Sequence, residues 1–271
     1  MSRNLFENVK GLLRPPYLYS RFHARAALQR FAEWRSAEDR GPIPLPPPLL
    51  RHRVHGTFDA SYLAVGQRCA QDIRDLVESV GRSLPSFGSI LDFGCGSGRV
   101  IRHFHDLAPS CRLHGTDIDA EAIRWCQTNL RFARFESNGA MPPTGYPDDS
   151  FDFIYGISVF THLNEEMQFA WLDELKRIAK PQALLLLSVH GRTDLPQWSE
   201  EDRALIARQG FLYRVTESTA FRLHRAQPGF YQRAQHSREY VEANWSRRFR
   251  ILSYVEAGIN NHQDAVLVEN A

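Results

Sequence analysis

A short apolar segment that runs directly into three glycines constrains the fold of this chain more than any other feature. The segment is residues 89–93 (Ser-Ile-Leu-Asp-Phe), and Gly94, Gly96 and Gly98 follow at every second position. Residues 89–93 have the length and apolar character of a buried strand. Glycines let the chain turn sharply and let a ligand approach the bare backbone. The pattern predicts a strand, a ligand-binding turn and then a helix, because apolar residues recur at helical spacing over residues 100–107.

Further strands and helices alternate after the glycines. Residues 113–117 and 151–158 are predicted strands, and residues 183–189 form an apolar run without alternation, as expected for a strand covered on both faces. Asp119 and Asn164 can each cap the helix that precedes the next strand. Strands separated by helices of this length predict right-handed crossovers and an α/β fold with a doubly wound, mostly parallel sheet.

The two ends of the chain differ from this alternation. Residues 1–41 are predicted to form one or two basic helices, and five prolines crowd into residues 42–48, where they favour an extended linker. Apolar spacing predicts a helix over residues 60–80. Residues 249–255 and 263–268 are two more predicted strands, which we expect to pair antiparallel.

Composition excludes several classes of protein. The chain is 43% hydrophobic and 11% aromatic, which supports a sizeable core and excludes wholesale disorder. A net charge of +2 predicts no strong overall attraction to nucleic acid or membranes. The four cysteines are neither paired nor grouped with histidines, so we expect no disulfide scaffold and no metal site. No apolar run approaches the roughly 20 residues of a membrane span, and we expect a cytoplasmic protein.

The glycine turn distinguishes between two kinds of cofactor. A dinucleotide-binding turn has a third glycine where this chain has Arg99. Asp92 stands two residues before Gly94, and a carboxylate there repels a pyrophosphate but attracts a cationic amino-acid group. The spacing therefore favours S-adenosylmethionine over a nicotinamide dinucleotide.

A second acidic position supports a nucleoside ligand. Asp117 ends a predicted strand about 20 residues after the glycines, where an acid can accept hydrogen bonds from both ribose hydroxyls. Asp119 is a rival for this role, although its position as a helix cap gives it a structural explanation. Both cofactors carry the ribose, so this feature does not separate them.

The sequence resembles the class I S-adenosylmethionine-dependent methyltransferases, including bacterial members. The segments that carry the resemblance are residues 90–100 (ILDFGCGSGRV), 115–119 (GTDID), 150–154 (SFDFI), 158–163 (SVFTHL) and 177–181 (RIAKP). They occur in the order and at the spacing of the family. The resemblance implies a seven-stranded, Rossmann-like sheet, mostly parallel with an antiparallel last strand, preceded by an N-terminal helical arm. One departure is Gln182-Ala183, where relatives usually have two glycines.

The resemblance also implies a division of the chain. Residues 1–56 would form the N-terminal arm and linker, and residues 57–271 the methyltransferase domain. Within that domain, residues 88–190 would be the core, and residues 191–271 would supply the acceptor lid and the last strands.

Roles for single residues follow from the same resemblance. The methionine end of the cofactor would meet one group, the ribose and adenine a second, and Ser158 would face the sulfonium and the acceptor. The first group is Asp92, Gly94 and Gly96, and the second is Asp117, Ile118, Asn138 and Gly139.

The catalytic group is less constrained. Methyl transfer from a sulfonium depends mainly on positioning, but a hydroxyl acceptor also needs a base, for which histidine is the usual choice. His162 follows a strand at the edge where ligands bind in such sheets. His236 and Tyr231 belong to an aromatic-rich tail suited to a lid over a polar ring. Alternatively, His162 has a structural role at the start of a helix, where its ring forms hydrogen bonds with backbone groups. The aromatic residues of the tail would then pack against the last two strands.

We therefore expect an enzyme that uses S-adenosylmethionine to O-methylate a small molecule or a sugar or glycan. A nucleic-acid methyltransferase is the first alternative, encouraged by the many arginines. It is disfavoured because Ser158-Val-Phe-Thr replaces the Asn/Asp-Pro-Pro-aromatic motif of exocyclic-amine methylation. A non-catalytic module that only binds the cofactor is the second alternative. The oligomeric state stays open.

Overall fold

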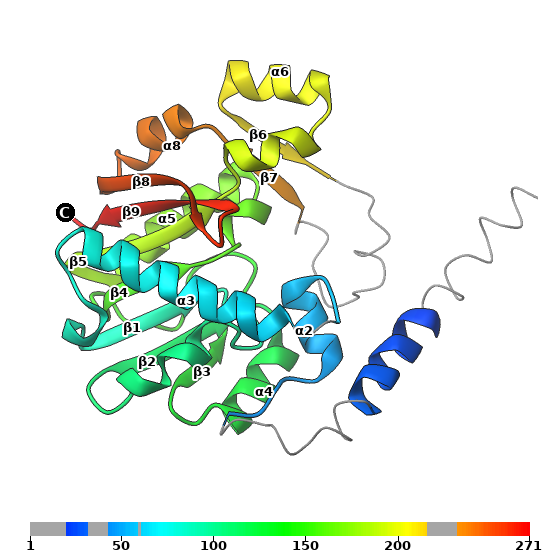
Figure 1. Cartoon of the computed structure of the whole chain (residues 1–271). Coiled ribbons are helices and arrows are strands. Elements are labelled where there is room, and N and C mark those ends of the chain that lie inside the picture. The colour runs from blue at the N-terminus through cyan, green and yellow to red at the C-terminus, as the bar shows by residue number, and fades with distance from the viewer. Residues whose placement is uncertain (1–19, 32–42, 59–60, 216–231) are drawn as a thin grey trace, which may run out of the picture.

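Seven strands form one sheet at the centre of the protein. The structure is a computed structural model and describes residues 20–31, 43–58, 61–215 and 232–271. The strand order is β3-β2-β1-β4-β5-β9-β8, as Figure 1 shows. The strands are β1 (Ser89–Phe93), β2 (Arg112–Asp117), β3 (Arg134–Ser137), β4 (Phe151–Gly156), β5 (Ala179–Val189), β8 (Arg250–Ile259) and β9 (Gln263–Glu269).

The direction of the strands confirms the predicted fold class. Neighbours among β1 to β5 pair in parallel, and β9 pairs antiparallel with β5 and with β8. The last strand is thus the antiparallel one. Because β9 runs the other way, its first residue, Gln263, lies near the carboxyl end of β5, where Val189 pairs with Asp264.

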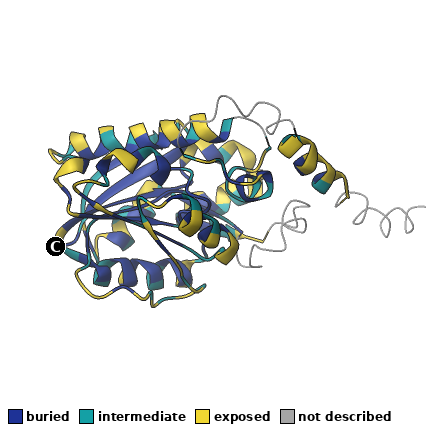
Figure 2. Cartoon of the chain, turned by 90° about the horizontal axis from the view of Figure 1, so that it is seen from below, coloured by how far each residue is buried: buried dark blue, intermediate teal, exposed yellow. Residues whose placement is uncertain are grey.

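Helices cover both faces of the sheet, because successive residues of each buried strand point to opposite sides. Ile90 and Leu184 pack with α3 (Ser61–Ser79) and α4 (Ala120–Asn129) in one apolar cluster. Leu91 and Leu185 pack with α5 (Glu165–Ile178) and α8 (Arg238–Trp245) in another. In Figure 2 the strands are buried and the helices are exposed on their outer sides. The predicted three-layer α/β arrangement is confirmed.

Local signals at the helix starts act as predicted. The Asp119 carboxylate accepts from the backbone N–H of Glu121 and Ala122 at the start of α4, and Asn164 caps α5 through the N–H of Met167. The segment after the glycines differs from the prediction. It is a 3-10 helix, η3 (Ile101–Leu107), because Phe104 and Leu107 are three residues apart and both stay buried in this tighter winding.

A small second sheet lies across the carboxyl ends of β4 and β5. It pairs β6 (Phe211–Arg214) with β7 (Arg233–His236), and α6 (Glu200–Gln209) precedes it. The N–H of Gln232 bonds to the carbonyl of His162, and the N–H of His236 bonds to the carbonyl of His190. These two contacts place the segment that the sequence assigned to a lid over the edge of the main sheet.

The proline-rich segment ends in a helix, α2 (Pro48–His55), which lies beside α4 in Figure 1. Residues 20–31 form a separate helix that contacts α2 through the rings of Phe22 and His52. The division expected at residue 56 thus falls just after α2. Within the described ranges, no helix combines the length and apolar character required to cross a bilayer.

Candidate active site

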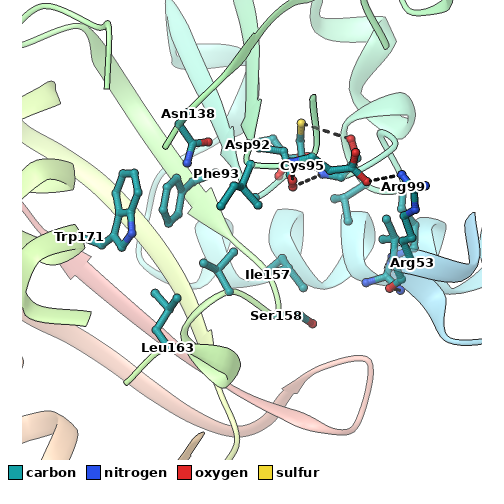
Figure 3. Close-up of a pocket in the computed structure, with 18 of the residues that line it drawn as sticks. Arg53, Asp92, Phe93, Cys95, Arg99, Asn138, Ile157, Ser158, Leu163 and Trp171 are labelled. Atoms are coloured by element: carbon teal, nitrogen blue, oxygen red, sulfur yellow. Dashed lines mark hydrogen bonds and ion pairs between the residues drawn. The ribbon is translucent and has the colours of Figure 1, made fainter. Parts of the chain in front are cut away.

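A cleft of about 1060 Å³, partly open to solvent, lies at the carboxyl edge of β1, β2 and β4. Figure 3 shows it between the glycine turn, α2 and the segment after β4. Every cofactor-binding residue that the sequence predicted lines this cleft: Asp92, Gly94, Gly96, Asp117, Ile118, Asn138, Gly139 and Ser158.

The glycine turn is closed to side chains at two positions. Gly94 has φ 78°, and a Cβ there would lie 2.2 Å from Val159 Cγ2. Gly96 has φ 52°, and its Cβ would lie 2.5 Å from Val54 Cγ2 on α2. The bare backbone is therefore required by both conformation and packing. The N–H groups of Gly94 and Gly96 are used within the protein, since they donate to the Thr116 carbonyl and to Asp117 Oδ2.

Asp92 presents a buried carboxylate to the cleft. Its side chain is 3% exposed, and within the described part of the chain its Oδ2 has no hydrogen-bond partner. Burial raises the pKa of Asp92 to about 7, against the lowering effect of the Tyr155 hydroxyl on the neighbouring strand. A buried carboxylate without a partner is costly unless a cation or donor completes it. This site therefore fits an ammonium group.

Asp117 lies at the end of β2, on the other side of the glycine turn. Its Oδ2 accepts from the N–H of Gly96 at 2.7 Å, and its Oδ1 accepts from the N–H of Asp119 at 2.8 Å. Burial raises the pKa of Asp117, and these two bonds lower it in part. Each oxygen keeps a second lone pair, so the carboxylate can also accept from ribose hydroxyls.

Asp119, the rival for the ribose, has other partners. Besides capping α4, its carboxylate pairs with the Arg53 guanidinium at 2.9 Å. Arg53 also pairs with Glu121 at 2.7 Å. These bonds explain Asp119 structurally and connect α2 to α4.

Asn138 and Gly139 follow β3 and form one wall of the cleft. Asn138 Oδ1 accepts from the Thr116 hydroxyl at 2.9 Å, and Asn138 Nδ2 donates to the carbonyl of Gly139 at 2.7 Å. Trp171 on α5 donates to the carbonyl of Ala140 at 3.1 Å. Trp171 lies beside Phe93 in Figure 3, with ring centroids 4.8 Å apart. This wall thus combines the polar side chain of Asn138 with the two aromatic rings.

The sequence did not predict four residues that shape the cleft: Arg53, Val54, Arg99 and Trp171. Arg53 and Val54 come from α2, in the segment expected to be a linker. Arg99 donates to the carbonyl of Val54 at 3.3 Å. The positive charge of the two arginines was the only signal for them in the sequence. Arg53 contacts Asp119, which is 66 positions later in the chain, and local sequence patterns do not predict such a distant contact.

His162 is not among the residues that line the cleft, whereas its neighbour Leu163 is. Its Nδ1 is 2.6 Å from the backbone oxygen of Gln232. Burial lowers the pKa of His162 to about 4, so the ring is neutral near pH 7. Because a carbonyl only accepts, Nδ1 carries the proton and Nε2 is the basic nitrogen.

The other two catalytic candidates have different positions. His236 is 2% exposed, does not line the cleft, and bonds through Nε2 to Gln168 Oε1 at 2.8 Å. Burial lowers the pKa of His236 to about 3. This position gives the predicted catalytic role no support, because the ring joins β7 to α5. Tyr231 lies outside the described residues.

One group of metal-ligand side chains gathers near His162, and its acid is already engaged. His190, Asp194 and His262 bring potential ligand atoms within 4.8 Å of one another. However, Asp194 Oδ2 accepts from Arg233 at 2.5 Å and from Trp198 at 3.2 Å. The carboxylate therefore serves first to hold β7 in place.

The cleft, the glycine turn and the sheet order are those of one enzyme family. Residues 65–252 match the family described as methyltransferase domain. This protein is a member of that family. The methyltransferase uses S-adenosylmethionine as its methyl donor, and the residues around the cleft fit this molecule: Asp92 offers a carboxylate oxygen with no hydrogen-bond partner among the described residues, and the glycines offer a bare backbone.

Two curated relatives share part of the chain. An Arabidopsis thaliana protein named tRNA (carboxymethyluridine(34)-5-O)-methyltransferase is 32% identical over 108 residues, which cover 40% of this chain and 25% of that protein. A Gallus gallus tRNA N(3)-cytidine methyltransferase is 26% identical over 119 residues, covering 40% of this chain and 32% of that protein. The methyltransferase thus matches a third or less of the length of either relative.

Solved structures share the fold over most of the chain. A Pyrococcus horikoshii protein has a TM-score of 0.53 at 15% identity and covers 80% of this chain and 97% of its own. An Aquifex aeolicus S-adenosylmethionine-dependent methyltransferase has a TM-score of 0.51 at 16% identity, covering 82% and 98%. Likeness at this level of identity concerns the fold alone.

Proposed function

We propose that this methyltransferase O-methylates a small molecule or a sugar. The donor supplies an activated methyl group on a sulfonium. The chain's own residues must then bind the donor, place the acceptor oxygen in line with the methyl group and accept the proton of the acceptor.

Donor binding is assigned from the chemistry of the cleft. Asp92 would bind the ammonium group of the methionine end, and the arginines that line the same cleft, Arg53 and Arg99, would bind its carboxylate. Asp117 would accept from the ribose hydroxyls. Ile118 and the wall at Asn138 and Gly139 would enclose the adenine, the last assignment being the one expected from the resemblance.

The observation that supports an oxygen atom as the methyl acceptor is a pair of histidine rings that follow β4 and β5. His162 Nδ1 bonds to the oxygen of Gln232, and His190 Nδ1 bonds to the oxygen of Ala234 at 3.1 Å. The two ring centroids are 6.1 Å apart. Two carbonyls at the start of β7, two residues apart, therefore fix both rings in the same tautomer, with Nε2 as the basic nitrogen.

Burial lowers the pKa of His190 as well as that of His162, so both bases are neutral at physiological pH. A hydroxyl that gains a methyl group must lose its proton, and a positioned neutral imidazole accepts it. His162 is our first candidate for this base because it is adjacent in sequence to Leu163, which lines the cleft, although the His162 ring itself does not line it.

The experiment is a labelled-methyl transfer assay. Purified protein is incubated with isotope-labelled S-adenosylmethionine and pools of glycosides, phenols, hydroxy acids, amines or tRNA, and products are identified by mass spectrometry. The proposal predicts label on oxygen of a glycoside, phenol or acid, and no label with the Asp117→Ala variant. Label only on amine nitrogen, or only on RNA, would contradict it.

A tRNA acceptor is the second candidate. The two curated relatives are named for tRNA methylation, one of them on a carboxymethyl oxygen, and this name is the observation that favours it. The matched stretch covers 40% of this chain in each case. In this chain the small sheet of β6 and β7 lies at the ends of β4 and β5. The tRNA pool in the same assay distinguishes the two candidates.

A further inference from the structure

Ser158 has a strained backbone at the end of the cleft where the segment after β4 begins. Its φ is 61°, a left-handed conformation that a residue with a Cβ seldom adopts. Such a conformation persists only where surrounding contacts hold it, and it is frequent at functional sites. Ser158 lines the cleft beside Val159, so the strain is located where a ligand would lie.

Three hydrogen bonds in a closed ring hold this residue. The N–H of Ser158 donates to Ser188 Oγ at 2.8 Å. The Ser188 hydroxyl donates to Gln263 Oε1 at 2.7 Å. Gln263 Nε2 then donates to Ser158 Oγ at 2.7 Å. In this arrangement each member donates once and accepts once, and the Ser188 hydroxyl also lies 3.5 Å from the carbonyl oxygen of Gly156.

The direction of the ring leaves one hydrogen unused. Ser158 Oγ accepts from Gln263, and its own hydroxyl hydrogen meets no acceptor among the described residues. A hydroxyl is one donor and can accept twice, so this hydrogen is available to a ligand in the cleft.

Two members of the ring belong to strands of the main sheet. Ser188 is near the end of β5 and is 0% exposed, and Gln263 begins β9 and is 9% exposed. The antiparallel course of β9 brings Gln263 to the edge where β4 and β5 end. The last strand of the sheet thus contributes to the site through a residue that never lines it.

We propose that the Ser158 hydroxyl donates a hydrogen bond to the acceptor atom, and that Ser188 and Gln263 are positioning residues that aim it. This inference rests on the proposed function and extends it to the choice of acceptor atom. The carbon–sulfur bond breaks as the carbon–oxygen bond forms, the acceptor proton goes to the base, and Ser158 keeps its own proton.

Such a donor selects oxygen over an amine nitrogen. An alcohol or carboxylate oxygen has at least two lone pairs, so one can accept from Ser158 while another attacks the methyl carbon. A neutral amine nitrogen has a single lone pair, and a hydrogen bond from Ser158 would occupy the pair needed for attack. Ser158 therefore favours oxygen acceptors on chemical grounds.

The first test uses S-adenosylhomocysteine as the probe and needs no acceptor. Calorimetric titration compares the wild type with Ser158→Gly, which removes the hydroxyl and suits the positive φ. We expect the Kd to stay within about twofold, since the hydroxyl faces the acceptor. A Kd about tenfold weaker would show that the hydroxyl serves the cofactor and would overturn the inference.

A crystal structure with S-adenosylhomocysteine gives the second test. We expect the ring of Ser158, Ser188 and Gln263 to be retained and Ser158 Oγ to lie beyond hydrogen-bond distance of every cofactor atom. A bond from Ser158 to the cofactor carboxylate, or a broken ring, overturns the inference. If the protein binds no S-adenosylhomocysteine at all, the proposed function fails with it, so the two failures are distinguishable.

Gln263→Glu separates positioning from structural support. Glutamate keeps the size and still accepts from Ser188, but its second oxygen cannot donate to Ser158 and accepts the Ser158 hydrogen instead. On the hydroxylated substrate that the labelled-methyl assay identifies, we expect Gln263→Glu and Ser158→Gly to raise the acceptor KM alike, by about tenfold, at unchanged cofactor Kd. Wild-type acceptor kinetics in Gln263→Glu would overturn the role of the ring.

Discussion

Arg53 and Asp119 form an ion pair of 2.9 Å that connects α2 to the start of α4 across the mouth of the cofactor cleft. The two residues are 66 positions apart, and their side chains are 17% and 16% exposed. Because Arg53 and Val54 line the cleft, this pair decides whether one wall of the site is in place. Two residues of α2, which follows the proline-rich segment, thus line the cleft that we propose for the donor.

Replacing Arg53 should weaken donor binding. Arg53→Met removes the pairs with Asp119 and Glu121 and a cation that faces the methionine carboxylate, so we expect the Kd for S-adenosylmethionine to rise by about tenfold or more. Calorimetry measures the change. Arg82→Met is the matched control, since it removes a pair with Glu269, which lies outside the cleft. Equal affinities of the two variants would contradict this account of α2.

The glycine turn permits a test of packing at a single atom. Gly96→Ala places a Cβ against Val54 at positive φ, and we expect a loss of S-adenosylmethionine affinity of roughly a hundredfold. Gly81→Ala is the control, because Gly81 also has a positive φ but has open space around its Cβ position. Adding Val54→Ala to Gly96→Ala should restore part of the affinity. No recovery would mean that the backbone conformation alone accounts for the loss.

Asp92 should make donor binding depend on pH. Its pKa is raised to about 7, and the ammonium group requires the carboxylate form, so affinity should fall by up to tenfold per pH unit below about pH 7. Titrations between about pH 5.5 and 8 measure this slope. Asp92→Asn should bind weakly at every pH, and a slope that persists in the variant would assign it to another group.

The same carboxyl group should cost the free protein stability. Folding raises its pKa from 3.8 to about 7, so the folded state retains a proton that the unfolded chain has released. The free energy of unfolding therefore decreases as pH rises through that window, by at most roughly 4 kcal/mol. Without donor, Asp92→Asn should raise the Tm at pH 8 and change it little near pH 4. A lower Tm at pH 8 would contradict the assignment.

Two histidine variants should differ in kind. His162→Gln removes the proposed base, and we expect kcat to fall by about a hundredfold with the donor Kd unchanged. His236→Gln replaces a buried ring bonded to Gln168, and we expect a loss of about 1–3 kcal/mol of stability with a smaller effect on kcat. Activity assays and thermal unfolding together test this pair. A large loss of kcat in His236→Gln, with only a small loss in His162→Gln, would instead indicate that His236 is the base.

Local patterns predicted residues that the structure brings together along one cleft, because the elements that carry them are short and regular. The strand that ends at Phe93 and the caps at Asp119 and Asn164 depend on neighbours within a few residues. Gln182 stands where relatives usually have glycine. Its φ is 63°, so this larger residue keeps the left-handed turn that glycine favours.

The acceptor side was predicted less well because it depends on contacts between distant segments. The aromatic tail suggested His236 as catalytic, but its burial follows from β7 crossing the ends of β4 and β5, which no local spacing shows. Gln263 gave no signal either, since its role arises only when the last strand runs antiparallel. The positions of β7 and β9 thus determine the acceptor side of the site, which the sequence did not predict.

The most direct test of the account is calorimetric titration of the protein with S-adenosylmethionine and S-adenosylhomocysteine, repeated on Asp117→Ala. The account predicts micromolar binding of both ligands by the wild type and a loss of at least about tenfold in the variant, because Asp117 supports the glycine turn through Gly96 and meets the ribose. Absence of binding by the wild type, or equal binding by the variant, would contradict the placement of the donor in this cleft.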